Sequence, residues 1–332
     1  MSYVIAHRGV WLQAPENTLP AFQDAVEMKI DGIETDIQLT LDGQLVIHHN
    51  YSVDGTADGT GKISEMTLKE LKTLDFGSYR GERYRGLRIA TLEECLETVR
   101  PLAIVNLELK APMDRDFPYV EAVVETVRRF HMESNVILSA FDHSLLARAK
   151  KLCPEIRVGA LVLPPSASGS PIMEIVRSAL PVHKPLSAIC REDILLTEEE
   201  RHILGQADIV AREPEDVAVE LAHSLSAIYP NLDLGQVEDL WGRQQDLDSY
   251  IGHLDFKMDF LHPNYQMVLQ DQSMISRLAD KGILVNPYTP DDPKELKQLW
   301  DLGCHGIITN RPDLLMKIKE TPFFCDDKDD IV

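Results

Sequence analysis

Short apolar runs and amphipathic segments alternate along most of the chain. Eight runs are rich in Val, Ile and Leu and have polar residues at their ends, which is typical of buried strands. They span residues 3–6, 32–37, 102–109, 135–140, 157–163, 258–261, 282–286 and 306–309. Segments with helical spacing of apolar residues lie between them, at residues 19–28, 92–99, 120–130, 144–152, 274–280, 294–302 and 314–318. Strand and helix repeated in this order predict a parallel sheet with right-handed crossovers.

Eight such units are the number that closes a (β/α)8 barrel, the TIM-barrel fold. The alternative is an open doubly wound sheet, but the turn after the first strand, residues 7–9, lacks the G-x-G-x-x-G phosphate loop. Active sites of (β/α)8 barrels lie at the carboxyl ends of the strands. Polar residues gather at these ends in this chain: His7, Arg8, Glu34, Asp36, Glu108, Lys110, Ser139, His262, Asn264, Tyr288 and Thr289.

Two segments are longer than a barrel connection requires. Residues 51–88 are rich in Gly, Asp and Tyr and predict a small loop-rich excursion that overhangs the mouth of the active site. Residues 164–257 open with the linker-like PPSASGSP and continue with helical spacing, which predicts an inserted helical subdomain after the fifth strand. The barrel itself is then expected in residues 1–163 and 258–320.

Two carboxylates project from the second predicted strand. Glu34 and Asp36 are two residues apart, so both point to one side of the strand, with Cα atoms about 7 Å apart. Adjacent acids repel each other unless a cation lies between them. The alternative is an exposed ribbon whose acids face water, but the apolar residues that flank both acids are not needed in such a ribbon.

A hairpin after this strand predicts which histidine lies beside the acids. Asp42-Gly43 favours a two-residue type I′ turn, which makes residues 44–49 an antiparallel return strand. In that register Asp36 lies directly opposite His49, with Cβ atoms roughly 5 Å apart. His48 then points to the other face of the ribbon.

Composition and charge restrict the class of protein. The chain has 332 residues, a formal net charge of −21 and a pI near 4.9. Nucleic-acid phosphates would be repelled over most of such a surface, so no nucleic-acid partner is expected. The five cysteines are far apart and form no C-x-x-C pair, which indicates reduced thiols and favours the cytoplasm.

The ends of the chain and its hydropathy add to this expectation. No apolar run approaches the roughly 20 residues of a membrane helix, and the first residues lack a signal peptide. We therefore expect neither a transmembrane segment nor export. Residues 321–332 form an acidic stretch that is expected to be a frayed tail.

The residue types at the strand ends indicate a metal and a phosphate. Glu34, Asp36 and Glu108 offer three hard oxygen ligands on neighbouring strands, a set that suits one Mg²⁺ or Ca²⁺ and is poor for zinc. Arg8 and Lys110 add two cations at the same rim, which favours an anionic substrate with a phosphate group. Either basic residue alone is also compatible with a structural ion pair.

Two histidines complete the candidate site. His7 and His49 titrate near neutral pH, so they can take a proton from a nucleophile and give one to a leaving alkoxide. A lone histidine after a strand is usually structural. Two histidines that converge on three acids and two basic residues are much less often so.

Several short motifs occur along the chain in a fixed order. They are HRG at 7–9, PENT at 15–18, ETD at 34–36 followed by His49, NLELK at 106–110, SAF at 139–141, HPN at 262–264 and GIITNRPD at 306–313. Each motif alone is weak, but together they resemble the glycerophosphodiester phosphodiesterase family. The resemblance implies a TIM-barrel phosphodiesterase that uses a divalent metal to hydrolyse glycerophosphodiesters to glycerol 3-phosphate and an alcohol.

Matching motif positions assigns roles to individual residues. The resemblance implies an acid/base pair, a metal-ligand set and substrate contacts: His7 and His49; Glu34, Asp36 and Glu108; Arg8, Lys110 and Tyr288. The chain departs from the family pattern at four positions. Asn50, Gly55, Tyr288 and Asn310 stand where the family usually has Asp, Arg, Trp and Asp.

Two other functions stay open at this point. One is a lysophospholipase D-like activity on long-chain substrates, with the insertion as an apolar lid. The other is a catalytically silent barrel whose insertion serves as a protein-interaction module. The sequence also leaves open whether water or the adjacent glycerol hydroxyl is the nucleophile, which histidine is the acid, and the oligomeric state.

Overall fold

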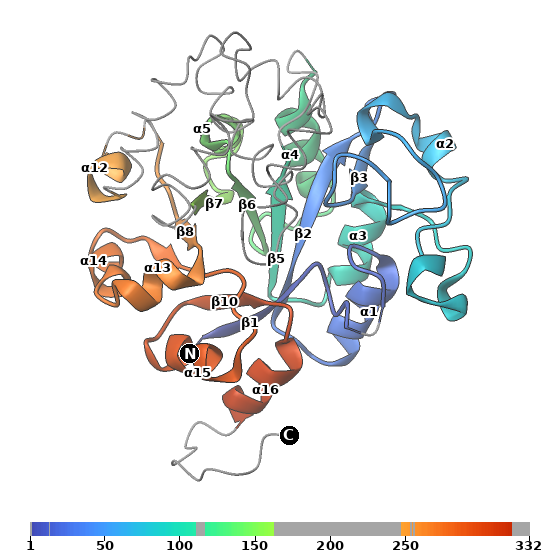
Figure 1. Cartoon of the computed structure of the whole chain (residues 1–332). Coiled ribbons are helices and arrows are strands. Elements are labelled where there is room, and N and C mark those ends of the chain that lie inside the picture. Colours follow the sequence, from blue (N-terminus) through green and yellow to red (C-terminus); the bar gives the residue numbers. More distant parts are fainter. Residues whose placement is uncertain are drawn as a thin grey trace, which may run out of the picture.

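The computed structural model describes residues 2–12, 14–110, 117–162, 247–252, 254 and 256–320. In this part of the chain, parallel strands form a sheet in the spatial order β10-β1-β2-β5-β6-β7-β8-β9 (Figure 1). Their bounds are β1 Tyr3–His7, β2 Gly32–Leu39, β5 Ile104–Leu109, β6 Val136–Ala140, β7 Arg157–Val162, β8 Phe260–Pro263, β9 Leu284–Val285 and β10 Gly306–Thr309. Each of the eight predicted strands is confirmed, with ends that differ by a few residues.

The sheet closes on itself between β9 and β10. The backbone N–H of His305 donates to Val285 O (3.0 Å), and that of Ile308 donates to Pro287 O (3.0 Å). Tyr288 forms a parallel bridge with Ile308 next to the second of these bonds. This closure excludes the open doubly wound sheet and confirms the (β/α)8 barrel.

Helices follow the strands and surround the barrel, as Figure 1 shows. They are α1 Leu19–Glu27, α3 Leu92–Val99, α4 Tyr119–Arg129, α5 His143–Leu152, α12 Leu247–Gly252, α13 Tyr265–Gln270, α14 Met274–Asp280, α15 Pro293–Asp301 and α16 Pro312–Glu320. Local capping explains where several begin. Thr91 and Glu94 form a capping box at α3, and the Asp292 side chain accepts from Lys294 N at the start of α15.

Strand alternation divides the apolar residues into two cores. On β1, Val4 and Ala6 point outward and pack under the helices, whereas Ile5 points into the barrel. The inner cluster is small and buried: Ile5, Ile104, Ile137, Phe141, Leu161, Phe260, Tyr288 and Ile308. The barrel is therefore a packed core up to the level at which the strands end.

The hairpin after β2 is present, but its predicted register is wrong by one residue. Strand β3, Leu45–Ile47, pairs antiparallel with β2, and Ile37 lies opposite Ile47. By this register Asp36 lies opposite His48, whose N–H donates to Asp36 O (3.0 Å).

The turn explains the error in register. The N–H of Thr40 donates to Gln44 O (3.0 Å), so three residues, 41–43, form the loop instead of two. Gly43 supplies the left-handed conformation (φ +73°) that ends such a loop. The Asp42 carboxylate holds the loop in place, because it accepts from Thr40 Oγ1 (2.6 Å) and from Leu68 N (2.9 Å).

The predicted excursion at residues 51–88 forms a small unit beside the hairpin. Its elements are η1 Ile63–Glu65, α2 Leu68–Leu71, η2 Ser78–Arg80 and η3 Glu82–Tyr84, and β4 Ala90–Thr91 then pairs with β3. An apolar cluster joins the excursion to β3 and to the residue before β4: Val46, Val53, Ile63, Leu71, Phe76 and Ile89. Arg80 reaches back to the loop after β1 and donates to Trp11 O (2.7 Å).

Other predicted segments lie outside the described residues. These are most of the predicted insertion at 164–257, of which α12 is described, and the whole tail at 321–332. Within the described ranges, no helix combines the length and apolar composition needed to cross a membrane.

Candidate active site

Strand alternation carries the candidate residues to the inner face of the barrel. His7 follows Ile5 by two residues on β1, so its side chain lies above the inner apolar cluster. The parallel registers then set residues side by side: His7 with Glu34, and Asp36 with Glu108. Residues from β1, β2 and β5 thus meet at the carboxyl ends of the strands.

Three carboxylates form a buried cluster at this point. Glu34, Asp36 and Glu108 each offer an oxygen, and these oxygens lie within 4.8 Å of one another. The three residues are 3%, 1% and 8% exposed. Burial, followed by the charges of Asp36 and Glu108, raises the pKa of Glu34 well above its ordinary value.

The cluster has the features of a site for a hard divalent cation. Among the described residues, Glu34 Oε1 is a buried oxygen with no hydrogen-bond partner. Uncompensated carboxylates in a site of low polarity are costly, and a bound cation removes that cost. Oxygen ligands of this kind suit Mg²⁺ or Ca²⁺. The residues present therefore fit a metal.

Lys110 lies inside the same cluster. Its Nζ is 2.7 Å from Glu108 Oε1 and 3.3 Å from Asp36 Oδ1, and its side chain is only 3% exposed. Burial by itself raises the pKa of Asp36, but the charges of Lys110, His49 and Arg8 bring it below the ordinary value. Asp36 is thus held as a carboxylate.

Arg8 reaches the cluster from the loop after β1. Its guanidinium contacts Glu16 Oε1 (2.7 Å) and lies 3.8 Å from Asp36 Oδ2, and its backbone N–H donates to Glu34 Oε2 (3.2 Å). Burial alone lowers the pKa of Arg8, but the charges of Glu16, Asp36 and Glu34 outweigh it and raise this pKa. The side chain therefore stays a fixed cation, 13% exposed, at the rim of the site.

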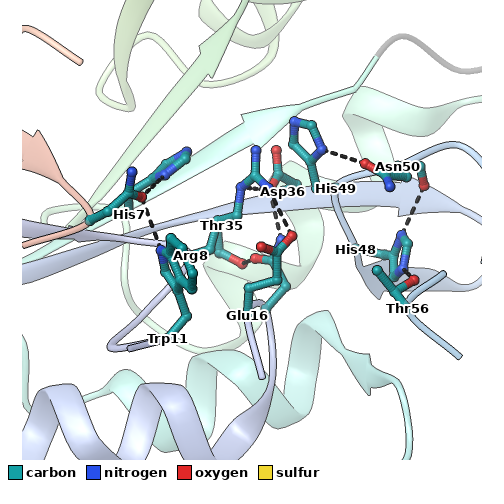
Figure 2. A network of polar contacts seen from close by, with 12 residues as sticks. His7, Arg8, Trp11, Glu16, Thr35, Asp36, His48, His49, Asn50 and Thr56 are labelled. Carbon is teal, nitrogen blue, oxygen red and sulfur yellow. Dashed lines mark hydrogen bonds and ion pairs between the residues drawn. The ribbon is translucent and has the colours of Figure 1, made fainter. Parts of the chain in front are cut away.

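His7 lies at the edge of the carboxylate cluster. Its Nε2 is 3.7 Å from Glu34 Oε2. Its Nδ1 is 2.6 Å from Asn310 Oδ1, which also accepts from Trp11 Nε1 (2.9 Å). Figure 2 shows His7, Arg8 and Trp11 grouped on one side of the site.

The adjacent histidines of the hairpin have different surroundings. His49 Nδ1 is 2.7 Å from Asn50 Oδ1, and Figure 2 shows His49 next to Asp36. His48 lies with Thr56, 2.8 Å from its Oγ1, on the far side of the bend from Asp36 (Figure 2). Burial lowers the pKa of His48 to about 4. His49 therefore lies beside the acids, as predicted, although the register from which we predicted it is wrong.

A bend explains this outcome. Pairing of β3 ends at Ile47, and the Gln38 side-chain amide then donates to three successive carbonyls, those of His48, His49 and Asn50. The chain curls around this amide, so the alternation of the strand no longer applies.

Three other polar residues predicted at the strand ends, Tyr288, His262 and Asn264, make structural contacts. Tyr288 packs edge-on against Phe141 (6.2 Å between ring centroids), and its hydroxyl donates to Val162 O (2.9 Å). His262 is buried inside the barrel, and the Asn264 side chain caps α13. The role of Tyr288 as a substrate contact stays a prediction.

Sequence reasoning assigned no role to several residues that hold the site together. Glu16 pairs with Arg8, and Asn17 Nδ2 donates to Asp36 Oδ2 (2.8 Å). Asn310 contacts His7, and its own amide is held by Asp291. The motifs at 15–18 and 306–313 contain three of these four residues, so the motifs carried a signal, but only the fold shows what each residue contacts.

Barrels of this type perform their chemistry at the carboxyl ends of the strands, which is where the buried charges of this chain meet. The fold and the site together thus define a barrel enzyme. The model of the "Glycerophosphoryl diester phosphodiesterase family" matches residues 7–182 and 245–314, and the chain belongs to this family. It is accordingly a phosphoric diester hydrolase by family.

Individual relatives agree with this assignment. A "Glycerophosphodiester phosphodiesterase" from Caldanaerobacter subterraneus is 41% identical over 159 residues, which are 48% of this chain and 65% of that protein. A protein of the same name from Bacillus altitudinis is 27% identical over 322 residues, 96% of this chain and 99% of that protein. These relatives support neither the long-chain nor the catalytically silent alternative.

A solved structure has the same fold over nearly the whole chain. It is an Oleispira antarctica phosphodiesterase in complex with the product sn-glycerol-3-phosphate. The TM-score is 0.65 at 25% identity, and the match covers 96% of this chain and 97% of that chain.

Proposed function

We propose that this chain hydrolyses small glycerophosphodiesters to glycerol 3-phosphate and an alcohol. The observation that carries the proposal is the cluster of three buried carboxylates, whose oxygens lie within 4.8 Å of one another beside two basic residues and two histidines. The names of the relatives and the sn-glycerol-3-phosphate in the Oleispira enzyme support this substrate class.

Glu34, Asp36 and Glu108 would hold one divalent cation, either Mg²⁺ or Ca²⁺. Such an ion, when bound, neutralises the charge of the phosphodiester and polarises its phosphorus–oxygen bonds. The Arg8 guanidinium and the Lys110 ammonium contact the phosphate oxygens and stabilise the charge that develops on them.

His7 and His49 transfer the protons. Each ring is bonded through Nδ1 to an asparagine side chain, Asn310 or Asn50, which orients it relative to the acids. One histidine takes the proton of the nucleophile, and the other donates a proton to the leaving alkoxide. Either water or the adjacent glycerol hydroxyl serves as nucleophile, and only the hydroxyl gives a cyclic phosphate. Trapping of a cyclic phosphate by rapid quench distinguishes them.

The division of the chain belongs to the same proposal. Residues 1–163 and 258–320 form the phosphodiesterase barrel, and residues 51–88 form the excursion beside its mouth. Residues 164–257 act on substrate access or assembly and contribute no residue to bond breaking. Replacing that segment with a short Gly/Ser linker should leave turnover of a small, activated phosphodiester.

The direct test is an assay of the purified chain on glycerophosphocholine, with detection of glycerol 3-phosphate. A chelator should abolish hydrolysis, and added Mg²⁺, Mn²⁺ or Ca²⁺ should restore it. Glu34→Gln should remove the activity, whereas Glu97→Gln, an exposed acid on α3, serves as the matched control. Full activity in chelated, metal-free buffer, or turnover of lysophosphatidylcholine alone, would contradict the proposal.

A further inference from the structure

Asn310 occupies a central position behind His7. It follows β10, and its Oδ1 is 2.6 Å from His7 Nδ1 and 2.9 Å from Trp11 Nε1. Its Nδ2 donates to Asp291 Oδ2 (2.8 Å), and its backbone N–H donates to Asp291 Oδ1 (2.9 Å). The amide therefore has partners at both ends.

The chemistry of two partners determines which way the amide points. An indole N–H only donates, so the atom facing Trp11 has to be the amide oxygen. A carboxylate accepts, so the atom facing Asp291 has to be the amide nitrogen. Each partner requires the same orientation independently, which removes the usual ambiguity of an asparagine side chain.

This orientation determines the proton on the His7 ring. The Asn310 oxygen can only accept from His7, so Nδ1 carries a hydrogen. A neutral imidazole has one N–H, and the second nitrogen, Nε2, therefore carries the lone pair. Nε2 is the atom that lies 3.7 Å from Glu34 Oε2, on the side of the carboxylate cluster.

We infer that Asn310, clamped by Asp291, is a positioning residue that holds His7 in the Nδ1–H tautomer and so leaves Nε2 unprotonated, as the ring atom that exchanges protons with the reactants. This inference rests on the proposed function for its effect on catalysis. Asn310 thus acts on the reaction through His7 and does not itself touch the substrate. Trp11 supports the same arrangement, and Arg80 from the excursion holds Trp11 through its carbonyl (2.7 Å) and ring (5.6 Å to the centroid).

The first experiment removes the acceptor and keeps the shape. Asn310→Leu should lower kcat about 10-fold to 100-fold, the same range as the loss of a partner that orients a metal-bound histidine. KM should change less than about threefold, because Asn310 does not contact the substrate. Asn135→Leu is the matched control, since Asn135 donates to Leu102 O (3.1 Å) ahead of β6, away from the site.

The second experiment exchanges the two partners. Asp291→Asn alone should lower kcat, because two amides then face each other with unmatched donors and acceptors. The double variant Asn310→Asp/Asp291→Asn keeps every one of these contacts with the carboxylate and amide interchanged, and it should recover most of kcat. If Asn310→Leu does not fold, this pair of variants still decides the matter. No recovery in a folded double variant would overturn the inference.

A direct measurement locates the proton. Long-range ¹H–¹⁵N correlation spectra of histidine-labelled, metal-free protein at alkaline pH distinguish the protonated ring nitrogen from the unprotonated one. The His7 signal, assigned by its loss in His7→Gln, should show Nδ1–H in the native protein and a mixture in Asn310→Leu. A native His7 protonated at Nε2 would overturn the inference.

The two proposals can fail separately. If the protein hydrolyses no glycerophosphodiester, the proposed function fails, while the spectra still decide where the His7 proton lies. If the protein is active and Asn310→Leu keeps kcat within twofold, the positioning role fails and the proposed function stands.

Discussion

The interior of the barrel contains an apolar region and a charged region, although the same strands build both. Ile5 and His7 are two residues apart on β1, and Ile104 and Glu108 are four apart on β5. All four side chains point inward because each strand alternates its faces. One step of the alternation on β1, and two steps on β5, thus separate packing from chemistry.

The two regions are stabilised in different ways. The apolar cluster gains free energy from burial, and it needs no partner other than close neighbours. The charged cluster contains three buried acids, which are stable only where Arg8, Lys110 or a bound ion offsets their charge. Changes in the apolar region should therefore affect stability, whereas changes in the charged region should affect activity or metal dependence.

The largest effect is expected at His49. His49→Ala should lower kcat about a hundredfold to ten-thousandfold, the range for a general acid or base, with nearly unchanged melting temperature. His48→Ala should instead change the melting temperature more than kcat, because the His48 ring fills a buried site between Thr56 and Phe76. Steady-state kinetics and thermal unfolding of both variants measure the two quantities, kcat and the melting temperature. Loss of turnover in a well-folded His48→Ala protein, with an active His49→Ala, would exclude the assignment.

The next largest effect is expected on stability when Lys110, the cation inside the acidic cluster, is removed. Lys110→Met should destabilise the metal-free protein by about 3 kcal/mol, because it leaves Asp36 and Glu108 buried without their ammonium partner. Saturating Mg²⁺ or Ca²⁺ should restore most of this loss. Denaturant unfolding of the native protein and the variant, first with chelator and then with metal, measures the destabilisation in each condition. Equal destabilisation in the two conditions would argue against a metal at this cluster.

A change in the apolar region should show the contrary behaviour. Ile137 on β6 is fully buried in the inner cluster. Ile137→Ala should lower the free energy of unfolding by about 2–4 kcal/mol through lost burial and a cavity, while the folded fraction keeps its kcat. Denaturant titration and an assay below the unfolding transition test this. A large drop in kcat without loss of stability would mean that the two regions are not separate.

The smallest effect is a dependence of stability on pH. His262 lies inside the barrel, and burial, followed by the charge of His305, lowers its pKa to about 3. An unfolded histidine has a pKa near 6.5, so between about pH 6.5 and 3 the unfolded chain binds a proton that the native protein does not. This stability is complete above pH 6.5 and is lost as the pH falls. The loss in the free energy of unfolding should amount to about 2 kcal/mol at pH 5.

Unfolding curves at pH 7 and pH 5 measure this effect. His262→Gln should have a smaller difference between the two curves than the native protein, by roughly the contribution of one proton. An identical pH difference in both proteins would show that His262 is not the group that titrates.

The sequence was sufficient for features that depend on short-range periodicity. Alternation of apolar and polar residues located the strands, and the spacing of Glu34 and Asp36 showed that they share a face. The order of the motifs identified the family, which the family match confirms. These features are local because a strand imposes its period on a few consecutive residues, wherever the strand lies in the protein.

Only the tertiary structure decided features that depend on distant contacts. Leu68 N binds the Asp42 carboxylate and helps to hold a three-residue turn, so the register differs from the one that Asp42-Gly43 favours by itself. Asn310 meets His7 across 303 positions of the chain. A local pattern cannot contain such a contact, because it forms only when the closing strand of the barrel lies beside the first.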